Sequence, residues 1–478
     1  MAREVNGFPK RWQNKGLLLE RLKVAEFDLV VLGGGSGGYA CALRSAQLGL
    51  SVVLIEEDKL GGTCLHRGCI PTKALLHAGE IADNAREASQ FGVNAQFLSM
   101  DMPAVNAYKD GVVNRLHKGL QGLVKSRNIT FVEGHGRLVS PNTVEVSGEK
   151  YTGKNVLLAT GSYARSLPGL EIDGKRVITS DHALTLDYVP ASVIVLGGGV
   201  IGCEFASVWK SFGADVRIVE ALPHLVALED ESSSKQLERA FRKRGINFEL
   251  GVKFASAKVT DENVNVTLEN GKEFTADLLL VAVGRGPVSA NLGYEQQGIT
   301  MERGYVIVDD KCRTNVPGLW AVGDLIPTLQ LAHVGFGEGI LVAEEIAGLN
   351  PRPINYAGVP RVTYSDPEVA SVGLTTSQAK EKGYDVVELS YDLAGNGKAQ
   401  ILGTAGSVKL VSDKGGQILG VHMVGARVGE LLAEAQLIFN WEANANDVAS
   451  LIHAHPTLSE AMGEAHMALA GKPLHAHG

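Results

Sequence analysis

The chain of 478 residues is long enough for about three domains of roughly 150 residues each, and 45% hydrophobic with 21% charged residues is typical of a globular protein. A net charge of −8 and a pI near 5.9 argue against nucleic acids or anionic membranes as partners. No apolar run reaches the roughly 18 residues of a membrane span, and the 57 glycines indicate many turns at which the backbone approaches a ligand.

The first 25 residues are interpreted as an N-terminal extension. They place basic residues such as Arg3 and Lys10 ahead of the apolar stretch GLLLERL. Glu4, Glu20 and the lack of serine disfavour a transit peptide, so a short surface appendage is preferred. No signal peptide precedes the five scattered cysteines, and we therefore expect a cytoplasmic protein, in which a disulfide is more often catalytic than structural.

A nucleotide-binding unit is predicted from Phe27 onward, where FDLVVLGGGSGGYACALRSAQLGLSVVLIEE indicates a strand, a turn, a helix and a second strand. Gly33, Gly35 and Gly38 have GxGxxG spacing. Such glycines permit a tight turn and bring a pyrophosphate to the helix N-terminus, whose N–H groups and dipole favour an anion. Glu56 lies 18 residues after the last glycine and is placed to hold a ribose hydroxyl pair.

A cysteine pair follows in LGGTCLHRGCIPTKALL, with Cys64 and Cys69 five positions apart. In a regular helix their Cα atoms would be roughly 8 to 9 Å apart, whereas a disulfide needs about 4.4 to 6.8 Å. Gly68 and Pro71 help the backbone leave the helical path, and a helix beginning near Pro71 would lower the pKa of Cys69 at its N-terminus. We prefer an exchanging disulfide to an inert one, and to a zinc site, which would need two further ligands.

The nucleotide-binding pattern returns in SVIVLGGGVIGCEFASVWKSFGADVRIVEAL, with Gly197, Gly199 and Gly202 at the same spacing and Glu220 again 18 residues after the third glycine. This duplication predicts two dinucleotide sites on one chain. Because no arginine follows Glu220 in ADVRIVEALPHL, the free ribose of NAD is favoured over the 2′-phosphate of NADP. Arg217, before the strand end, is the nearby residue that could favour NADP instead.

Later apolar strands run into glycine at NVLLATGS, LLLVAVGRGP and GLWAVGDL. In the last of these, Asp324 follows Gly323 at a strand end. Its carboxylate can accept hydrogen bonds from a polyol chain, or it can cap the helix that follows.

The segment HAHPTLSEAMGEAHMAL near the C-terminus places Glu460 five residues after His455. A carboxylate bonded to one ring nitrogen fixes the tautomer and leaves the other nitrogen free to take a proton from a substrate thiol. A capping or packed histidine is the alternative interpretation. His453 is less favourably placed to act as the base.

Together these motifs resemble those of the pyridine nucleotide-disulfide oxidoreductases from about Phe27 to the end of the chain. Within that family, GGTCLHRGCIPTKALL and HAHPTLSE are similar to the members that oxidise dihydrolipoamide in 2-oxo acid dehydrogenase complexes. The resemblance implies an α/β fold with two Rossmann-like dinucleotide-binding domains, for FAD and NAD, and a C-terminal α+β dimerisation domain. The expected division is an N-terminal extension (1–25), an FAD-binding domain in two parts (26–155 and 286–350), an NAD-binding domain (156–285) and the dimerisation domain (351–478).

The resemblance also implies the roles of individual residues. His455 and Glu460 are expected to act in the active site of the partner subunit of a homodimer, and Lys73 and Glu204 match the pair beside the flavin ring. Other matching positions are Thr160, Gly161, Asp324, Ala332 and His333 on the flavin side, and Gly284 and Arg285 on the nicotinamide side. Two departures from the family pattern are GFGEG after LAHV, where alanine and further acids are usual, and the N-terminal extension.

The implied reaction begins when His455 deprotonates dihydrolipoamide and the substrate thiolate attacks Cys64. The second substrate thiol then displaces Cys64 to give lipoamide, and Cys69 passes the electron pair to FAD, from which hydride goes to NAD. The implied partners are the lipoyl domains and the acyltransferase core of a 2-oxo acid dehydrogenase complex, with no nucleic acid and no membrane. No metal is expected.

Other activities and one non-catalytic role compete with this interpretation. Glutathione reductase usually has a basic NADP pocket and GCVPKK in place of GCIPTK, and mycothione reductase is a weaker rival. Mercuric reductase would need a further C-terminal cysteine pair, which AGKPLHAHG lacks. A non-catalytic flavoprotein scaffold has no need for Cys64, Cys69, His455 and Glu460 together.

Overall fold

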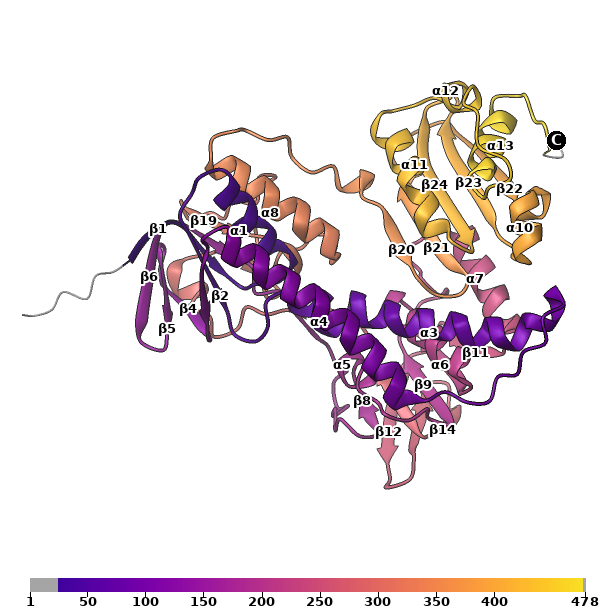
Figure 1. Cartoon of the computed structure of the whole chain (residues 1–478), viewed down its shortest axis with the longest axis horizontal. Coiled ribbons are helices and arrows are strands. Elements are labelled where there is room, and N and C mark those ends of the chain that lie inside the picture. Colours follow the sequence, from indigo (N-terminus) through magenta and orange to yellow (C-terminus); the bar gives the residue numbers. More distant parts are fainter. Residues whose placement is uncertain (1–24, 476–478) are drawn as a thin grey trace, which may run out of the picture.

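The computed structural model describes residues 25–475, so the expected N-terminal extension lies outside the described residues apart from Ala25. Figure 1 shows one sheet at the left, a second sheet at the lower centre and a C-terminal domain at the upper right. The long helix α3 (Cys69–Glu87) runs between the second sheet and the C-terminal domain. None of the helices within residues 25–475 combines the length and apolar character needed to cross a lipid bilayer.

The first sheet has the order β3-β2-β1-β6-β5-β4, and β19 pairs with the C-terminal end of β6, beyond the residues that pair with β5. Its central strands are continuous apolar runs, as expected where helices cover both faces of a parallel sheet. The return of β19 to this sheet shows that the chain enters the second sheet and comes back. The elements are β1 (Ala25–Leu32), β2 (Val52–Glu56), β3 (Thr130–Glu133), β4 (Gly136–Ser140), β5 (Thr143–Val146), β6 (Glu149–Leu158) and β19 (Leu319–Ala321), with α1 (Ser36–Gln47), α4 (Met102–Ser126) and α8 (Ala332–Ile346).

The second sheet is parallel throughout, with the order β11-β10-β9-β15-β8, and repeats the strand–turn–helix–strand start of the first. A small antiparallel sheet and a two-stranded ribbon, β7 with β16, accompany it. The elements are β7 (Ser162–Ala164), β8 (Val177–Ile178), α5 (Ser180–Ala183), β9 (Ser192–Leu196), α6 (Val200–Phe212), β10 (Asp215–Glu220), α7 (Glu231–Lys243), β11 (Ile246–Leu250), β12 (Phe254–Val259), β13 (Val264–Leu268), β14 (Glu273–Ala276), β15 (Leu278–Val281), β16 (Arg285–Pro287), β17 (Met301–Glu302) and β18 (Tyr305–Val306).

The C-terminal domain is an antiparallel sheet of order β20-β21-β24-β23-β22 packed against helices. The expected α/β fold, with two Rossmann-like units followed by an α+β unit, is therefore confirmed. The elements are β20 (Arg361–Thr363), β21 (Glu368–Gly373), α9 (Thr376–Glu381), β22 (Val386–Asp392), α10 (Gly397–Leu402), β23 (Ser407–Asp413), β24 (Ile418–Gly425), α11 (Val428–Asn440), α12 (Ala445–Ala449) and α13 (Glu460–Leu469).

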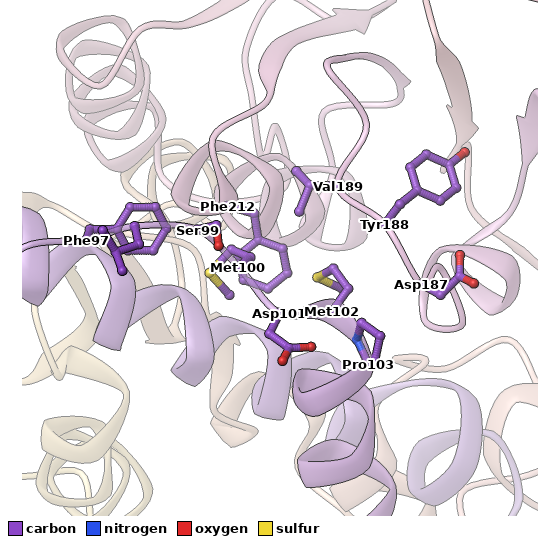
Figure 2. Close-up of a pocket in the computed structure, with 11 residues that line it drawn as sticks. Phe97, Ser99, Met100, Asp101, Met102, Pro103, Asp187, Tyr188, Val189 and Phe212 are labelled. Atoms are coloured by element: carbon purple, nitrogen blue, oxygen red, sulfur yellow. The ribbon is translucent and has the colours of Figure 1, made fainter.

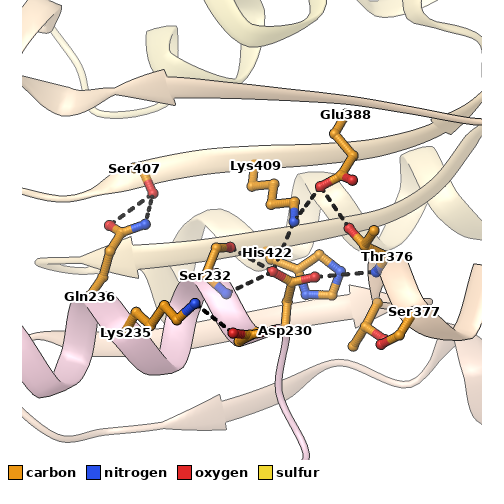
Figure 3. A network of polar contacts seen from close by, with 12 residues as sticks. Asp230, Ser232, Lys235, Gln236, Thr376, Ser377, Glu388, Ser407, Lys409 and His422 are labelled. Carbon is orange, nitrogen blue, oxygen red and sulfur yellow. Dashed lines mark hydrogen bonds and ion pairs between the residues drawn. The ribbon is translucent and has the colours of Figure 1, made fainter.

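A buried polar network fastens the C-terminal domain to the second nucleotide-binding unit (Figure 3). Asp230 caps α7 by accepting a hydrogen bond from the backbone N of Ser232 at 3.0 Å, and it also accepts one from Lys409 of β23 at 2.9 Å. Lys409 pairs in turn with Glu388 at 2.7 Å. Burial raises the pKa of Asp230, but the hydrogen bonds from Ser232 and Lys409 outweigh it and hold this pKa below its usual range, so the pair stays charged.

Candidate active site

The first glycine-rich turn leaves the N-terminus of α1 accessible to a ligand. Gly33 has φ +107°, and a Cβ there would lie 2.2 Å from the carbonyl oxygen of Ala159. A Cβ on Gly38 would lie 1.8 Å from the carbonyl oxygen of Gly33, so this glycine lets the helix pack on the strand. Gly35 instead precedes α1, and a Cβ at this position would meet no atom closer than 4.0 Å. The first turn of α1 carries no acidic side chain. The backbone N–H groups here fit the pyrophosphate of the expected FAD.

Glu56 is held at the edge of this turn. Its Oε2 accepts a hydrogen bond from the N of Gly34 at 2.6 Å, and its Oε1 accepts one from the N of Asp58 at 2.9 Å. Burial raises the pKa of Glu56 although both hydrogen bonds lower it. The carboxylate therefore lies at the end of β2 beside the glycines, where the sequence predicted a contact to ribose.

The second turn repeats this geometry. Gly197 has φ +105°, and a Cβ there would lie 2.3 Å from the carbonyl oxygen of Ala282, while a Cβ on Gly202 would lie 1.9 Å from that of Gly197. Gly199 precedes α6, and a Cβ at this position would meet no atom within 4 Å. Glu220 accepts a hydrogen bond from the N of Gly198 at 2.6 Å, as Glu56 does from Gly34. The two turns thus offer matching sites for two dinucleotides.

Arg217, the residue that could have favoured NADP, is already engaged. Its guanidinium pairs with Glu249 at 3.3 Å and stacks over the ring of Phe274 at 4.1 Å. Glu249 lies on β11, the neighbour of β10 in the second sheet, and Phe274 lies on β14 of the small antiparallel sheet. This leaves Glu220 as the charged side chain at the glycine turn, which favours a free ribose.

The junction of the two units carries a polar cluster around Asp324. Ser162 donates a hydrogen bond to the Asp324 carboxylate and accepts one from Nε of Arg285 at 2.7 Å. Gly161 and Gly284, with φ of +72° and +106°, form the turns that lead into the paired strands β7 and β16. Asp324 does not cap α8, because that helix begins at Ala332. The carboxylate remains available for a polyol chain.

Thr160 is engaged by the protein itself: its hydroxyl donates to the carbonyl oxygen of Val288 at 2.6 Å. Ala332 is the first residue of α8. His333 binds the carbonyl oxygen of Pro360 through Nε2 at 2.9 Å and so joins α8 to the start of the C-terminal domain.

Glu338 is a buried acid that sequence reasoning did not select. Its Oε2 accepts a hydrogen bond from the N of Gly323 at 2.6 Å, and its Oε1 accepts hydrogen bonds from Thr328 at 2.8 Å and from Tyr356 at 2.9 Å. Burial raises its pKa although these three donors lower it. Glu338 thus holds the turn that presents Asp324. The signal was the glutamate in GFGEG, which the family comparison marked only as a departure.

The cysteine pair spans a break between two helices. Cys64 lies on α2 (Gly62–Arg67), the backbone turns at Gly68 with φ −149° and ψ −113°, and α3 begins at Cys69. The expected departure from a regular helix is confirmed. The second helix begins at Cys69, two residues before Pro71, where the sequence predicted its start. Both residues are half-buried thiols in this structure.

The two thiols differ in acidity. The neighbouring Cys64 thiol, together with Lys73 and against the effect of burial, lowers the pKa of Cys69 to about 7. The neighbouring Cys69 sulfur, followed by burial, raises the pKa of Cys64. Cys69 is therefore the sulfur that ionises first, as expected for a thiol at a helix N-terminus.

Lys73 and Glu204 form an ion pair beside the cysteines. The Lys73 Nζ lies 2.8 Å from each carboxylate oxygen of Glu204, which is 3% exposed. Burial lowers the pKa of Lys73, but the opposing effect of Glu204 is larger and raises this pKa above its usual value, so the ammonium stays charged. Since Lys73 follows Cys69 by one helical turn on α3, its charge favours the thiolate.

His455 and Glu460 are joined as expected. Nδ1 of His455 lies 2.9 Å from Oε1 of Glu460, and the imidazole is 78% exposed. Within residues 25–475, no hydrogen bond or ion pair links His455 to Cys64 or Cys69 of the same chain. His453 is occupied by Glu434 at 2.8 Å.

A separate pocket of about 710 Å³ lies between the stretch 97–103 and the segment 187–189, with Phe212 in its wall (Figure 2). Its lining mixes apolar side chains with the polar groups of Ser99, Asp101 and Asp187. None of the residues expected to act in the site lines it. The pocket is therefore distinct from the thiols and from both glycine turns.

Comparison with known proteins gives consistent matches over nearly the whole chain. Residues 27–339 match the model of the pyridine nucleotide-disulphide oxidoreductases, and residues 359–466 match the dimerisation domain of the same family. A dihydrolipoyl dehydrogenase of Bacillus subtilis is 42% identical, covering 94% of this chain and 99% of the relative. A mitochondrial dihydrolipoyl dehydrogenase of Arabidopsis thaliana is 40% identical, covering 94% and 92%. The crystal structure of LpdA from Mycobacterium tuberculosis superposes with a TM-score of 0.86 at 27% identity, covering 93% and 100%.

Proposed function

Because the chain belongs to the pyridine nucleotide-disulphide oxidoreductase family, we propose that it is a dihydrolipoyl dehydrogenase, which oxidises protein-bound dihydrolipoamide to lipoamide and uses FAD and NAD. The observation that carries the proposal is the Cys64–Cys69 pair at the start of α3, with Lys73 and Glu204 beside it. The two matched glycine turns support one dinucleotide on each side of this pair.

The proposed chemistry uses the two thiols as an exchanging disulfide. His455, with Nδ1 held by Glu460, takes the proton of a substrate thiol through Nε2. The substrate thiolate attacks the Cys64 sulfur, the Cys64–Cys69 bond breaks, and Cys69 leaves as a thiolate. The second substrate thiol then displaces Cys64 and closes the lipoamide disulfide, so two electrons reach the cysteine pair. When bound, FAD supplies the acceptor for this electron pair and NAD the acceptor for hydride.

Lys73 and Glu204 are proposed to stabilise the Cys69 thiolate next to the flavin. Gly33, Gly35, Gly38 and Glu56 would hold the FAD pyrophosphate and ribose, and Gly197, Gly199, Gly202 and Glu220 those of NAD. Thr160, Gly161, Asp324 and Ala332 would face the flavin, and Gly284 the nicotinamide side. The domain division expected from the sequence is part of the same proposal.

The match to the dimerisation domain supports a homodimer. We propose that His455 and Glu460 complete the site of the partner subunit, consistent with the exposure of His455 and with its lack of contact to the cysteines of its own chain. Binding to lipoyl domains and to the acyltransferase core of a 2-oxo acid dehydrogenase complex, and a location in the cytoplasm, are further parts of the proposal.

The decisive measurement compares rates with two substrate pairs. We expect rapid NAD reduction with dihydrolipoamide and little turnover of glutathione disulfide with NADPH. A faster reaction with glutathione disulfide would make the chain a glutathione reductase. A purified chain without bound flavin and without NAD-linked oxidation of dihydrolipoamide would overturn the proposal.

A further inference from the structure

Tyr364 contacts both members of the Lys73–Glu204 pair from the C-terminal domain. The centre of its ring lies 4.7 Å from the Lys73 Nζ, and its backbone N donates a hydrogen bond to Oε1 of Glu204 at 3.0 Å. Tyr364 follows β20, and β20 contacts α6, the helix that carries Glu204. The ion pair beside the cysteines is thus contacted on both of its members by a residue about 290 positions further along the chain than Lys73.

The backbone around Tyr364 is anchored without its side chain. The N of Asp366 donates to the hydroxyl of Ser207 on α6 at 3.1 Å, and Arg244 donates to the carbonyl oxygen of Asp366 at 2.8 Å. Ser365 is 2% exposed, and its hydroxyl donates to the carbonyl oxygen of Pro367 at 2.8 Å. Replacing the Tyr364 side chain should therefore leave the backbone hydrogen bond to Glu204 in place.

The Lys73 ammonium has two competing anionic neighbours. Glu204 holds it with both carboxylate oxygens, while Cys69 precedes it by one helical turn, a spacing at which Cβ atoms are roughly 5–6 Å apart. The face of an aromatic ring attracts a cation and shields it from water. Lys73 is therefore fixed between a carboxylate, a thiol and a ring rather than left to extend into solvent.

We propose that Tyr364 is a positioning residue that holds the Lys73 ammonium beside Cys69 through the face of its aromatic ring. The C-terminal domain thereby favours the Cys69 thiolate, although it contributes no sulfur and no glycine turn to this part of the chain. The inference rests on the proposed function only in that Cys69 acts as a thiolate.

The test measures ionisation of Cys69 in the purified, flavin-loaded protein carrying Cys64→Ser, in which serine keeps a hydrogen-bond donor. The rate of alkylation by iodoacetamide is followed against pH, since the thiolate is the reacting form. Cys41, Cys203 and Cys312 are buried, and a variant lacking both Cys64 and Cys69 gives the background. Tyr364→Leu should move the midpoint of the alkylation rate–pH curve to higher pH and slow alkylation near neutral pH about threefold to tenfold. The plateau of the alkylation rate at high pH should not change.

Two matched variants make the result specific. Tyr364→Phe keeps the ring face and should titrate like the parent. Phe97→Leu removes a ring that lies 3.9 Å from the guanidinium of Arg86 on the same helix α3, and it should leave the midpoint unchanged. An unshifted midpoint in Tyr364→Leu would overturn the inference, and so would an equal shift in Tyr364→Phe, which would assign the effect to the hydroxyl.

The same preparations separate this inference from the proposed function. Loss of NAD-linked dihydrolipoamide oxidation in the protein without substitutions would refute the proposed function, whatever the alkylation data show. Normal activity in that protein together with an unshifted Tyr364→Leu midpoint would refute only the role of Tyr364. An unchanged plateau in the leucine variant shows that the fold and access to Cys69 are intact.

Discussion

The Nδ1 atom of His455 lies 2.9 Å from Oε1 of Glu460, and the other oxygen of this carboxylate accepts a hydrogen bond from the N of Thr457 at 2.8 Å. One side chain therefore orients the imidazole and ties down the loop that carries it. Burial raises the pKa of Glu460, but the Thr457 N–H and His455 outweigh this and lower it, so the residue is an anion when it faces the ring.

Replacing Glu460 by glutamine should slow the reaction without unfolding the protein. The amide keeps a hydrogen bond to Nδ1 but no longer stabilises the imidazolium, so we expect kcat with dihydrolipoamide to fall about tenfold or more, within the range of general acid–base effects. Glu464→Gln is the matched control, because Glu464 binds His475 at 2.7 Å on the same helix α13. Equal rates in the two variants would rule out the role of Glu460.

The stability of the reduced protein should depend on pH through Cys69. Its pKa falls from 9.0 to about 7 in the folded chain, so the unfolded chain binds more protons between these values. The thiolate therefore contributes stability that is fully present above about pH 9 and is lost as the pH falls through about 7. Urea unfolding under reducing conditions should show the difference between the parent and Cys69→Ser growing with pH over this window.

The control for this pH dependence is Cys312→Ser. Cys312 is 2% exposed and burial raises its pKa, so it stays a thiol across the same window. We expect the stability difference from the parent to stay level near neutral pH and to change toward pH 9 in the direction opposite to that for Cys69, because only the unfolded chain ionises Cys312 there. A parallel pH dependence in Cys69→Ser and Cys312→Ser would contradict the assignment of the thiolate to Cys69.

Breaking the Lys73–Glu204 pair should lower the free energy of unfolding and raise the pKa of Cys69. Lys73→Met leaves a buried carboxylate without its cation, and we expect a loss of about 2 kcal/mol in the free energy of unfolding, below the roughly 3–5 kcal/mol of a fully buried pair, because the Lys73 side chain is 33% exposed. The double variant with Glu204→Met should recover stability but not the low pKa of Cys69. Denaturant unfolding and alkylation rates measure the two effects separately.

A surface pair provides the comparison for this loss of stability. Lys154 binds Asp28 at 2.7 Å, but its side chain is 78% exposed. Lys154→Met should change stability little, because solvent screens such a pair. If Lys154→Met and Lys73→Met destabilise equally, burial of Glu204 is not the cause.

Glu220 should set the preference for NAD over NADP. Glu220→Ala removes the carboxylate that binds the ribose of NAD and repels the 2′-phosphate of NADP. We expect the ratio of kcat/KM for NAD to kcat/KM for NADP to fall about tenfold or more, as for the loss of one charge-assisted hydrogen bond. Glu56→Ala, the matching change in the first unit, should reduce FAD retention and leave this ratio unchanged. An unaltered ratio in Glu220→Ala would assign the preference to other residues.

Local features could be predicted from the sequence because they depend on backbone geometry over a few residues. The spacing of Gly33, Gly35 and Gly38 indicated the turn, and the structure shows why each position must lack a Cβ or stay open. The same holds for the helix break at Gly68, where the residues between Cys64 and Cys69 cannot remain helical and still bring the sulfurs together.

Contacts between distant segments could not be predicted in this way. Glu338 was noted only as part of a departure from the family pattern, yet it holds the turn before Asp324 through Gly323. Arg217 left the choice of coenzyme open until Glu249 and Phe274 were found beside it.

The sequence by itself determined the duplicated glycine turns, their acids, the cysteine pair and the His455–Glu460 spacing, because period, φ preference and helix pitch act between near neighbours. The family resemblance indicated the Lys73–Glu204 pair, and only the tertiary structure showed that Tyr364 completes the surroundings of the Lys73 ammonium. Glu204 reaches it from α6 and Tyr364 from the C-terminal domain, and such packing depends on how separate elements bury their surfaces against one another. The acidity of Cys69 is therefore a property of three segments that meet only in the folded chain.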